Sequence, residues 1–192
     1  GYGNGNLYPY DLHITPENTF LIADYNEHRV FEVDNNGTYL RTIASYGAGD
    51  GQVNAPRCVH LGIDNRIYVA DTGQNRIQIF DRNGTFIKKF GTSGSGNGQF
   101  NQPYGLVTSN TGEIFVVEKS NYRVQAFDSN GSFLRKFGSS GSLEGQMNQP
   151  YDITFSDQGN LMVADFYNRR IVHFTTAGEF LHLPTVSDHP AH

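Results

Sequence analysis

The chain repeats itself at a fixed interval of 47 residues, and this period limits the folds it can adopt more than any other feature. Three series hold the interval without insertion or deletion: the prolines Pro9, Pro56, Pro103 and Pro150, the acids Asp24, Asp71, Glu118 and Asp165, and the arginines Arg29, Arg76, Arg123 and Arg170. Several series in phase predict a tandem array of four copies of one structural unit.

Each copy contains short runs that are typical of β-strands. In the third copy, the runs 104–109, 114–118, 123–128 and 132–138 are separated by turn residues, and no helical periodicity interrupts them. Aromatic residues make up 13% of the chain and 22 residues are glycine, which suits a sheet-rich fold with many turns. The Asn-Gly pairs at the hairpin tips predict type I′ turns, because both central residues of that turn take positive φ angles.

Four strands in a period of about 40 to 50 residues predict an all-β fold, a β-propeller built of four-stranded antiparallel blades. A single blade leaves both faces of its sheet uncovered, so successive copies must stack on one another. We expect a single domain over residues 1–185, with repeats at about 1–47, 48–94, 95–141 and 142–185, followed by a C-terminal tail at 186–192.

Two segments resemble the NHL repeat, a propeller-blade family named after an Asn-His-Leu motif. They are GSGNGQFNQPYGLV at 94–107 and IYVADTGQNRIQIF at 67–80. The naming motif itself is matched only in part, with its Asn at Asn121 and Asn168 and its His at His28. The resemblance implies an interaction module in a ring that commonly has five or six blades. The four copies here would then be a segment of a larger ring, close as a four-bladed one, or close by self-association with another chain.

The acid and the arginine of each copy are expected to lie across one hairpin, because the acid ends the second strand and the arginine begins the third. A catalytic pair would be special to one copy, whereas these pairs occur in all four. We therefore interpret them as a structural network of paired charges that orders each turn. The pairs are Asp24 with Arg29, Asp71 with Arg76, Glu118 with Arg123, and Asp165 with Arg170.

The residue after each proline differs between copies and is expected at the mouth of the innermost strand, near the axis of the ring. These residues are Tyr10, Arg57, Tyr104 and Tyr151. Tyrosine and arginine are enriched among residues that dominate binding energy in protein interfaces. This position predicts a partner-binding face, with packing against the next blade as the alternative.

An enzyme remains the alternative function, in the form of a metal-dependent lyase or hydrolase with ligands in the central channel. His13 and His60 fall in phase, as do Asp11 and Asp152, and these four are the candidate ligands for zinc or calcium. Zinc needs at least three ligands and calcium six or more oxygens, which these pairs do not supply. Moreover, in the peptidyl-amidoglycolate lyases, which resemble this family in fold, a zinc-binding His follows the proline in several blades, and no copy here has one. We expect no cofactor and a non-enzymatic role.

The net charge and the short motifs limit the classes of binding partner and the location that the sequence favours. A formal net charge of −5 disfavours RNA as the partner, because a nucleic-acid binder needs cations to displace phosphate counterions. A protein partner is favoured, with a glycan as the alternative. No apolar run is long enough to span a membrane. Three N-glycosylation acceptors lie at hairpin tips, which would fit a secreted glycoprotein, although Asn-Gly also serves the turn itself. They are Asn36, Asn83 and Asn130.

Overall fold

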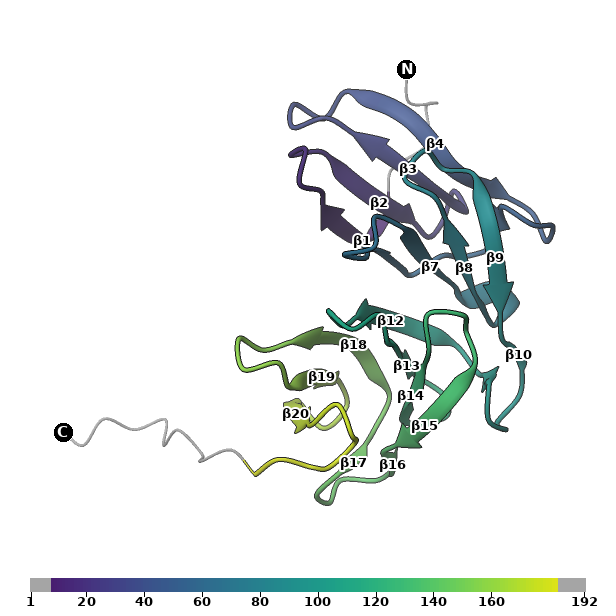
Figure 1. The fold of residues 1–192 in the computed structure, drawn as a ribbon. Coiled ribbons are helices and arrows are strands. Elements are labelled where there is room, and N and C mark those ends of the chain that lie inside the picture. The colour runs from purple at the N-terminus through teal and green to yellow at the C-terminus, as the bar shows by residue number, and fades with distance from the viewer. Residues whose placement is uncertain (1–7, 183–192) are drawn as a thin grey trace.

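The computed structural model describes residues 8–182, and these form four antiparallel sheets that succeed one another along an arc (Figure 1). The first sheet contains β1 (Pro9–Ile14), β2 (Phe20–Asp24), β3 (Arg29–Val33) and β4 (Tyr39–Tyr46), with the short β5 (Gln52–Val53) added in parallel. The second contains β6 (Cys58–Leu61), β7 (Ile67–Asp71), β8 (Arg76–Phe80) and β9 (Phe86–Phe90). The third contains β12 (Pro103–Thr108), β13 (Ile114–Glu118), β14 (Arg123–Phe127) and β15 (Phe133–Phe137).

The fourth sheet contains β18 (Pro150–Phe155), β19 (Leu161–Asp165) and β20 (Arg170–Phe174), and an isolated bridge from Phe174 to Phe180 marks where its outer edge begins. Short parallel pairs join successive sheets: β10 (Thr92–Ser93) with β11 (Gln99–Phe100), and β16 (Ser139–Ser140) with β17 (Gln146–Met147). One 3₁₀ turn, η1 (Thr72–Gln74), is the helical element of the described residues, and no helix there could cross a membrane. The prediction of an all-β chain in phase-locked repeats is confirmed, whereas the tail predicted at 186–192 lies outside the described residues.

The hairpin tips differ from the type I′ prediction. Gly37, Gly84 and Gly131 have positive φ angles of 82°, 87° and 84°, but the asparagine before each glycine does not. The reason is the aspartate that opens each turn: Asp34 Oδ1 accepts hydrogen bonds from the backbone N–H groups of Asn36 and Thr38. These bonds hold the residues before the glycine at φ angles that are not positive, so that glycine alone takes the left-handed conformation, as in a three-residue hairpin loop with a glycine bulge.

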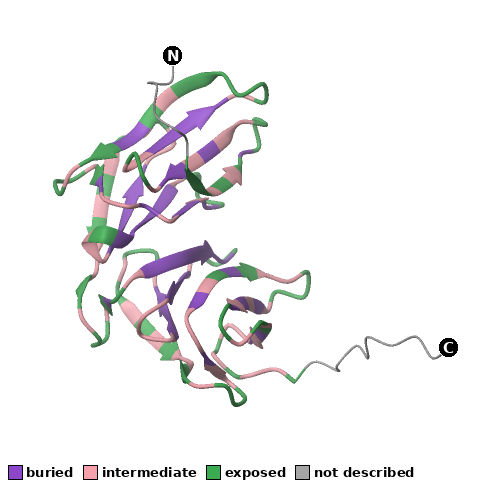
Figure 2. Cartoon of the chain, turned by 180° about the vertical axis from the view of Figure 1, so that it is seen from behind, coloured by how far each residue is buried: buried purple, intermediate pink, exposed green. Residues whose placement is uncertain are grey.

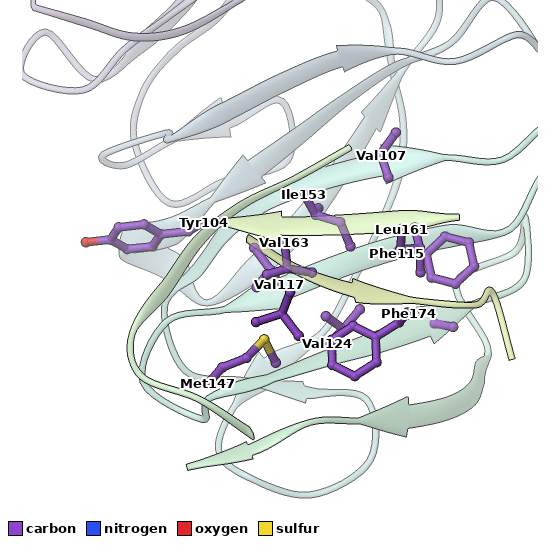
Figure 3. Packing of buried hydrophobic residues seen from close by; sticks show 12 residues of the cluster. Tyr104, Val107, Phe115, Val117, Val124, Met147, Ile153, Leu161, Val163 and Phe174 are labelled. Atoms are coloured by element: carbon purple, nitrogen blue, oxygen red, sulfur yellow. The ribbon is translucent and has the colours of Figure 1, made fainter. Parts of the chain in front are cut away.

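The hydrophobic core lies between the sheets. Figure 3 shows the layer between the third and fourth sheets, where Phe115, Val117 and Val124 pack against Val163 and Phe174. Equivalent layers join the first to the second sheet and the second to the third. Each fully buried aliphatic or aromatic side chain contributes ~1.5–3 kcal/mol to this packing. Figure 2 shows the result, with buried residues on the inner strands and exposed ones at the outer turns.

The two ends of the arc leave apolar side chains uncovered. Leu12 on β1 is 55% exposed, although Leu106, in phase two repeats later, is buried. At the other end, Ile171 on β20 is 54% exposed, while its counterparts Ile77 and Val124 are buried. In the inner sheets a neighbouring sheet covers these positions, and none of the described residues does so at the ends.

Candidate functional site

The residues that follow the four prolines gather at one end of the inner strands. The guanidinium carbon of Arg57 lies 4.3 Å from the ring centre of Tyr10 and 4.4 Å from that of Tyr104. The rings of Tyr104 and Tyr151 are 5.1 Å apart, and Figure 3 shows Tyr104 projecting away from the core side chains. Four residues separated by 47 positions in sequence thus form one continuous cluster.

The local backbone explains this placement. Pro9 is paired with Asp24 and Pro150 with Asp165, and in both sheets the register shifts immediately after the proline. Such a bulge inserts an extra residue into the strand and turns its side chain out of the regular alternation. The residues displaced in this way are Tyr10 and Tyr151, which therefore point along the end of the sheet.

A second in-phase series contributes to the cluster, and the sequence reading did not include it. It consists of the residues that follow the four acids: Tyr25, Thr72, Lys119 and Phe166. Tyr25 lies 4.0 Å from the guanidinium carbon of Arg57, and Lys119 Nζ lies 3.2 Å from the hydroxyl of Tyr104. Phe166 stacks on Tyr151 with ring centres 4.4 Å apart and planes within 3°. The sequence could have predicted this series. The proline and the acid of each copy were expected on adjacent strands, so the residues that follow them must lie at the same end of the sheet.

We call the combined surface the aromatic–cation face. It comprises Tyr10, Tyr25, Arg57, Tyr104, Lys119, Tyr151, Phe166 and Tyr167, the last of which contacts Phe166. A cavity of about 220 Å³ opens within it, lined by Tyr10, Asp11, Arg57, Tyr104, Tyr151 and Asp152. The face therefore combines exposed rings with two cations and a small polar cavity.

The two cations of this face have no acidic partner among residues 8–182. Most arginines of the chain form ion pairs with carboxylates, but neither Arg57 nor Lys119 does. Arg57 Nε is buried without a hydrogen-bond acceptor. Burial acts to lower the pKa of Lys119, but the hydrogen bond to Tyr104 and the nearby tyrosines outweigh it and raise that pKa. Burial raises the pKa of Tyr10, with Arg57 opposing the shift.

Asp11 and Asp152 lie deeper along the axis, since they line both this cavity and a second one of about 220 Å³ that contains Cys58 and His60. Asp11 Oδ2 accepts a hydrogen bond from Val59 N at 3.0 Å. Burial raises the pKa of both carboxyls, and Asp152 adds to the shift of Asp11. Cys58 is buried beside them, and burial raises the pKa of its thiol, which keeps it protonated.

His13 and His60 are in contact, with ring centres 4.8 Å apart at an interplanar angle of 78°. His60 Nε2 lies 3.0 Å from Thr108 Oγ1. Burial and the adjacent His13 lower the pKa of His60 to about 4, so the imidazole is neutral at physiological pH. Within residues 8–182 no three His, Cys, Asp or Glu side chains come close enough together to hold a metal ion. The residues present do not form a complete zinc or calcium site.

The acid–arginine pairs lie across the hairpins between the second and third strands. Arg76 Nε lies 2.6 Å from Asp71 Oδ2, and its other nitrogens donate to the backbone oxygens of Ala48, Gly49 and Gln52 in the preceding crossover. Arg123 repeats this arrangement with Glu118 at 2.6 Å. The outer copies are looser: Arg29 lies 3.4 Å from Asp24, and Arg170, 2.9 Å from Asp165, is a third exposed. These pairs tie each crossover to the following sheet, away from the axial cavities.

Two further features lie away from the aromatic–cation face. The asparagines Asn36, Asn83 and Asn130 are exposed at the tips of the outer hairpins. A cavity of about 460 Å³ lies between the turns of the third and fourth sheets, lined mainly by small polar residues such as Ser109, Thr111 and Ser156. Of its two acidic residues, Glu113 is paired with Arg135 at 2.8 Å, whereas Asp157 forms no ion pair with the described residues. No cationic side chain is among the residues that line this larger cavity, whereas Arg57 lines the smaller axial one.

Comparisons with known proteins identify the architecture. A family model described as a 6-bladed beta-propeller matches residues 61–107. A streptogramin B lyase superimposes on the chain with a TM-score of 0.71 and 16% identity, over 94% of this chain and 55% of that one. The virginiamycin B lyase of Staphylococcus aureus superimposes with a TM-score of 0.72 and 17% identity, over 95% of this chain and 58% of that one. The fold is that of a β-propeller.

The prediction of a propeller built of antiparallel blades is therefore confirmed. A chain from a nidogen–laminin complex is also similar, with a TM-score of 0.65 and 15% identity over 86% of this chain and 58% of that one. This chain spans a little over half the length of each of these structures. Identities this low establish a common fold only, and a search of curated protein sequences returns no significant match.

Proposed function

We propose that this chain is a non-enzymatic interaction module of the NHL type, which presents the aromatic–cation face to a protein partner. The observation that carries the proposal is the cluster around Arg57, where two tyrosines of the first blade and one of the third surround one cation of the second. Tyrosine and arginine anchors at the centre of a surface, with apolar rings beside them, are the composition of interface hot spots. Phe166 and Tyr167, more than half exposed, supply the apolar rim.

Further blades of the same protein are proposed to cover the two end faces and complete the ring. Three observations support this: the exposed Leu12 and Ile171, the six-bladed description of the matched family, and the partial coverage of the similar structures. The intact mass of the native protein tests it. A mass equal to that of the 192 residues alone would contradict further blades and favour closure by a second copy. The repeat boundaries predicted from the sequence are proposed to hold for each blade.

Capture experiments test the binding function. The wild-type protein, a Tyr151→Ala/Phe166→Ala double variant and a Leu134→Ala control are immobilised and exposed to an extract of the source cells. Leu134 is exposed on the outer strand β15, far from the axis in the blade. We expect a protein that the wild type and the control retain and the double variant loses. Equal retention by the double variant would refute the face as the binding surface. Elution of RNA or of a glycan in place of a protein would reassign the class of partner.

A metal-dependent lyase or hydrolase is a second candidate, supported by one observation: Asp11, Asp152, His13 and His60 all line one axial cavity. The missing ligands would have to come from further blades. Elemental analysis of the native protein decides between the two functions. Zinc or calcium at one equivalent per chain, lost in a His13→Ala/His60→Ala variant, would support the enzyme, and less than a tenth of an equivalent would reject it.

Glycosylation at the hairpin tips is proposed with a secreted location. The exposure of Asn36, Asn83 and Asn130 supports it, because an acceptor must be reached by the transferring enzyme. Expression through a secretory pathway, followed by intact mass measurement with and without glycosidase, checks it. An unshifted mass in the secreted protein would leave these residues with a turn-forming role alone.

A further inference from the structure

We propose that the aromatic–cation face binds an acidic segment of the partner, with Arg57 and Lys119 each contacting a carboxylate and the rings of Phe166 and Tyr167 contacting an apolar side chain that follows the acidic residues. This inference rests on the proposed function and specifies the chemistry of the partner.

Arg57 is the first cation in need of a partner. Its guanidinium is surrounded by the rings of Tyr10, Tyr25 and Tyr104 at 4.0–4.4 Å, and it forms no ion pair within the described chain. Rings stabilise a cation through their negative faces, but less than a carboxylate does, and a partly buried unpaired charge is costly. An arriving carboxylate would recover part of that cost.

Lys119 is the second cation and lies beside the first. Its Nζ is 5.1 Å from the centre of the Tyr104 ring that Arg57 also contacts, and 5.3 Å from that of Tyr151. Two cations on one ring are close enough for a single extended peptide. Side chains at positions i and i+2 of a strand point the same way at a separation of about 6.6 Å. A segment with acidic residues at alternate positions therefore matches both cations.

The rings beside Lys119 provide the apolar half of the site. Phe166 is 54% exposed and lies parallel to Tyr151, so the two present a flat stacked surface next to the cations. Tyr167, also exposed, extends this surface. A segment that is acidic along one part and apolar along another satisfies the whole face, whereas a purely charged one leaves these rings in water.

The face discriminates against cationic and polyphosphate ligands. A cation would be repelled by Arg57 and Lys119, and the three tyrosines that could enclose it already hold Arg57. A nucleic acid brings a long run of phosphates, which the net charge of −5 of the whole chain repels. Two or three carboxylates on a peptide suit two cations better than a continuous phosphate backbone does.

The test is a fluorescence-polarisation titration of the whole chain with a labelled peptide, Glu-Ser-Glu-Ser-Phe-Ser-Leu, whose acidic and apolar side chains lie on one side when it is extended, and with its Gln-Ser-Gln-Ser-Phe-Ser-Leu analogue. The variants are Arg57→Met and Lys119→Met, which keep the length of the stem and remove the charge. Lys136→Met is the matched control, since Lys136 is exposed on the outer strand β15. We expect the acidic peptide to bind the wild type and the control equally, about tenfold more weakly to each variant, and more weakly at high salt.

Several results would overturn the inference. Equal binding of the two peptides, or equal affinity of wild type and variants with unchanged thermal unfolding, would remove the role of the two cations. Tighter binding of a labelled oligouridylate than of the acidic peptide would assign the face to RNA. If the wild type does not bind the acidic peptide but still captures a protein in a way that depends on Tyr151 and Phe166, this inference is refuted and the proposed function is not. If the wild type neither binds the peptide nor captures a protein through these residues, the inference and the proposed function are both refuted.

Discussion

The guanidinium carbon of Arg57 lies 4.0 Å from the ring centre of Tyr25, across the boundary between the first two blades. Tyr25 follows an acid of the repeat and Arg57 follows a proline, so residues of two different in-phase series meet here. The repeat therefore fixes where side chains stand at the axis, and the differences between copies decide which chemistry they bring together.

A carboxylate that lines the cavity beside Arg57 is expected to weaken the binding of an acidic ligand. Asp152 lines the same cavity as Arg57, so replacing it with Asn removes a like charge from the approach of a carboxylate. Since a partly exposed charge contributes ~0.2–1 kcal/mol, we expect Asp152→Asn to bind the acidic peptide up to about fivefold more tightly. Titration against an Asp157→Asn control checks this, and an unchanged or weaker affinity would place the ligand away from this cavity.

The paired charges should contribute to stability in the order of their burial. Replacing Arg76 with Met leaves the buried carboxylate of Asp71 unpaired and breaks three bonds to the crossover backbone, and such a change costs about 3–5 kcal/mol. Arg123→Met should cost the same, because its contacts are equivalent. Arg29→Met should cost less, since Arg29 lies 3.4 Å from its acid and is a quarter exposed. Urea unfolding gives the three values, and equal losses at all three positions would contradict this ordering.

Glu32 should make stability depend on pH. Burial alone would raise its pKa, but hydrogen bonds from Arg82, Thr19 and Arg41 outweigh burial and lower the pKa to about 2. Because the pKa of Glu32 in the folded chain lies below the ordinary glutamate value of 4.5, the ionised group stabilises the fold above pH 4.5, and this stability is lost as the pH falls toward 2. The difference in unfolding free energy between wild type and Glu32→Gln should be constant from pH 5 to 7 and shrink below that. If the difference in unfolding free energy grew toward low pH, the pKa of Glu32 in the folded chain would be raised and not lowered.

Alanine substitutions at two hairpin glycines should distinguish the cost of backbone strain from the cost of steric crowding. Gly37 and Gly131 have φ angles of 82° and 84°, which cost an L-residue ~1–2 kcal/mol at either site. A Cβ at Gly37 would have no atom within 4 Å, whereas one at Gly131 would stand 2.6 Å from the Phe90 ring. Gly37→Ala should therefore lose about 1 kcal/mol and Gly131→Ala clearly more, as chemical unfolding would show. Equal losses would mean that Phe90 moves aside at no cost.

The period carried most of what the sequence predicted about the fold. Once Pro9, Pro56, Pro103 and Pro150 were in phase, strand order and stacking followed, because each sheet needs a neighbour on both faces. The type I′ turn was wrong for a local reason: the aspartate three residues before each glycine binds the turn backbone, which the Asn-Gly pair alone does not reveal.

The site was predicted in part. The residues after the prolines were identified because they vary at a fixed position, and the structure brings them together. Tyr25, Lys119 and Phe166 were missed because each directly follows an acid that all copies share, and the pairing of that acid with an arginine indicated a structural role for this end of the strand. The contact between His13 and His60 could not be predicted from the sequence, because a common phase does not say how close two side chains come at the axis.

Hydroxyl-radical footprinting of the chain, free and within its native complex, tests the central claim most directly, because it reports which side chains a partner covers. We predict that Tyr10, Phe166 and Tyr167, all exposed in the free chain, become protected, while Leu40 and Leu134 on the outer strands stay reactive. Protection of the outer strands with the three rings still reactive would contradict the account and place recognition on the rim of the blades.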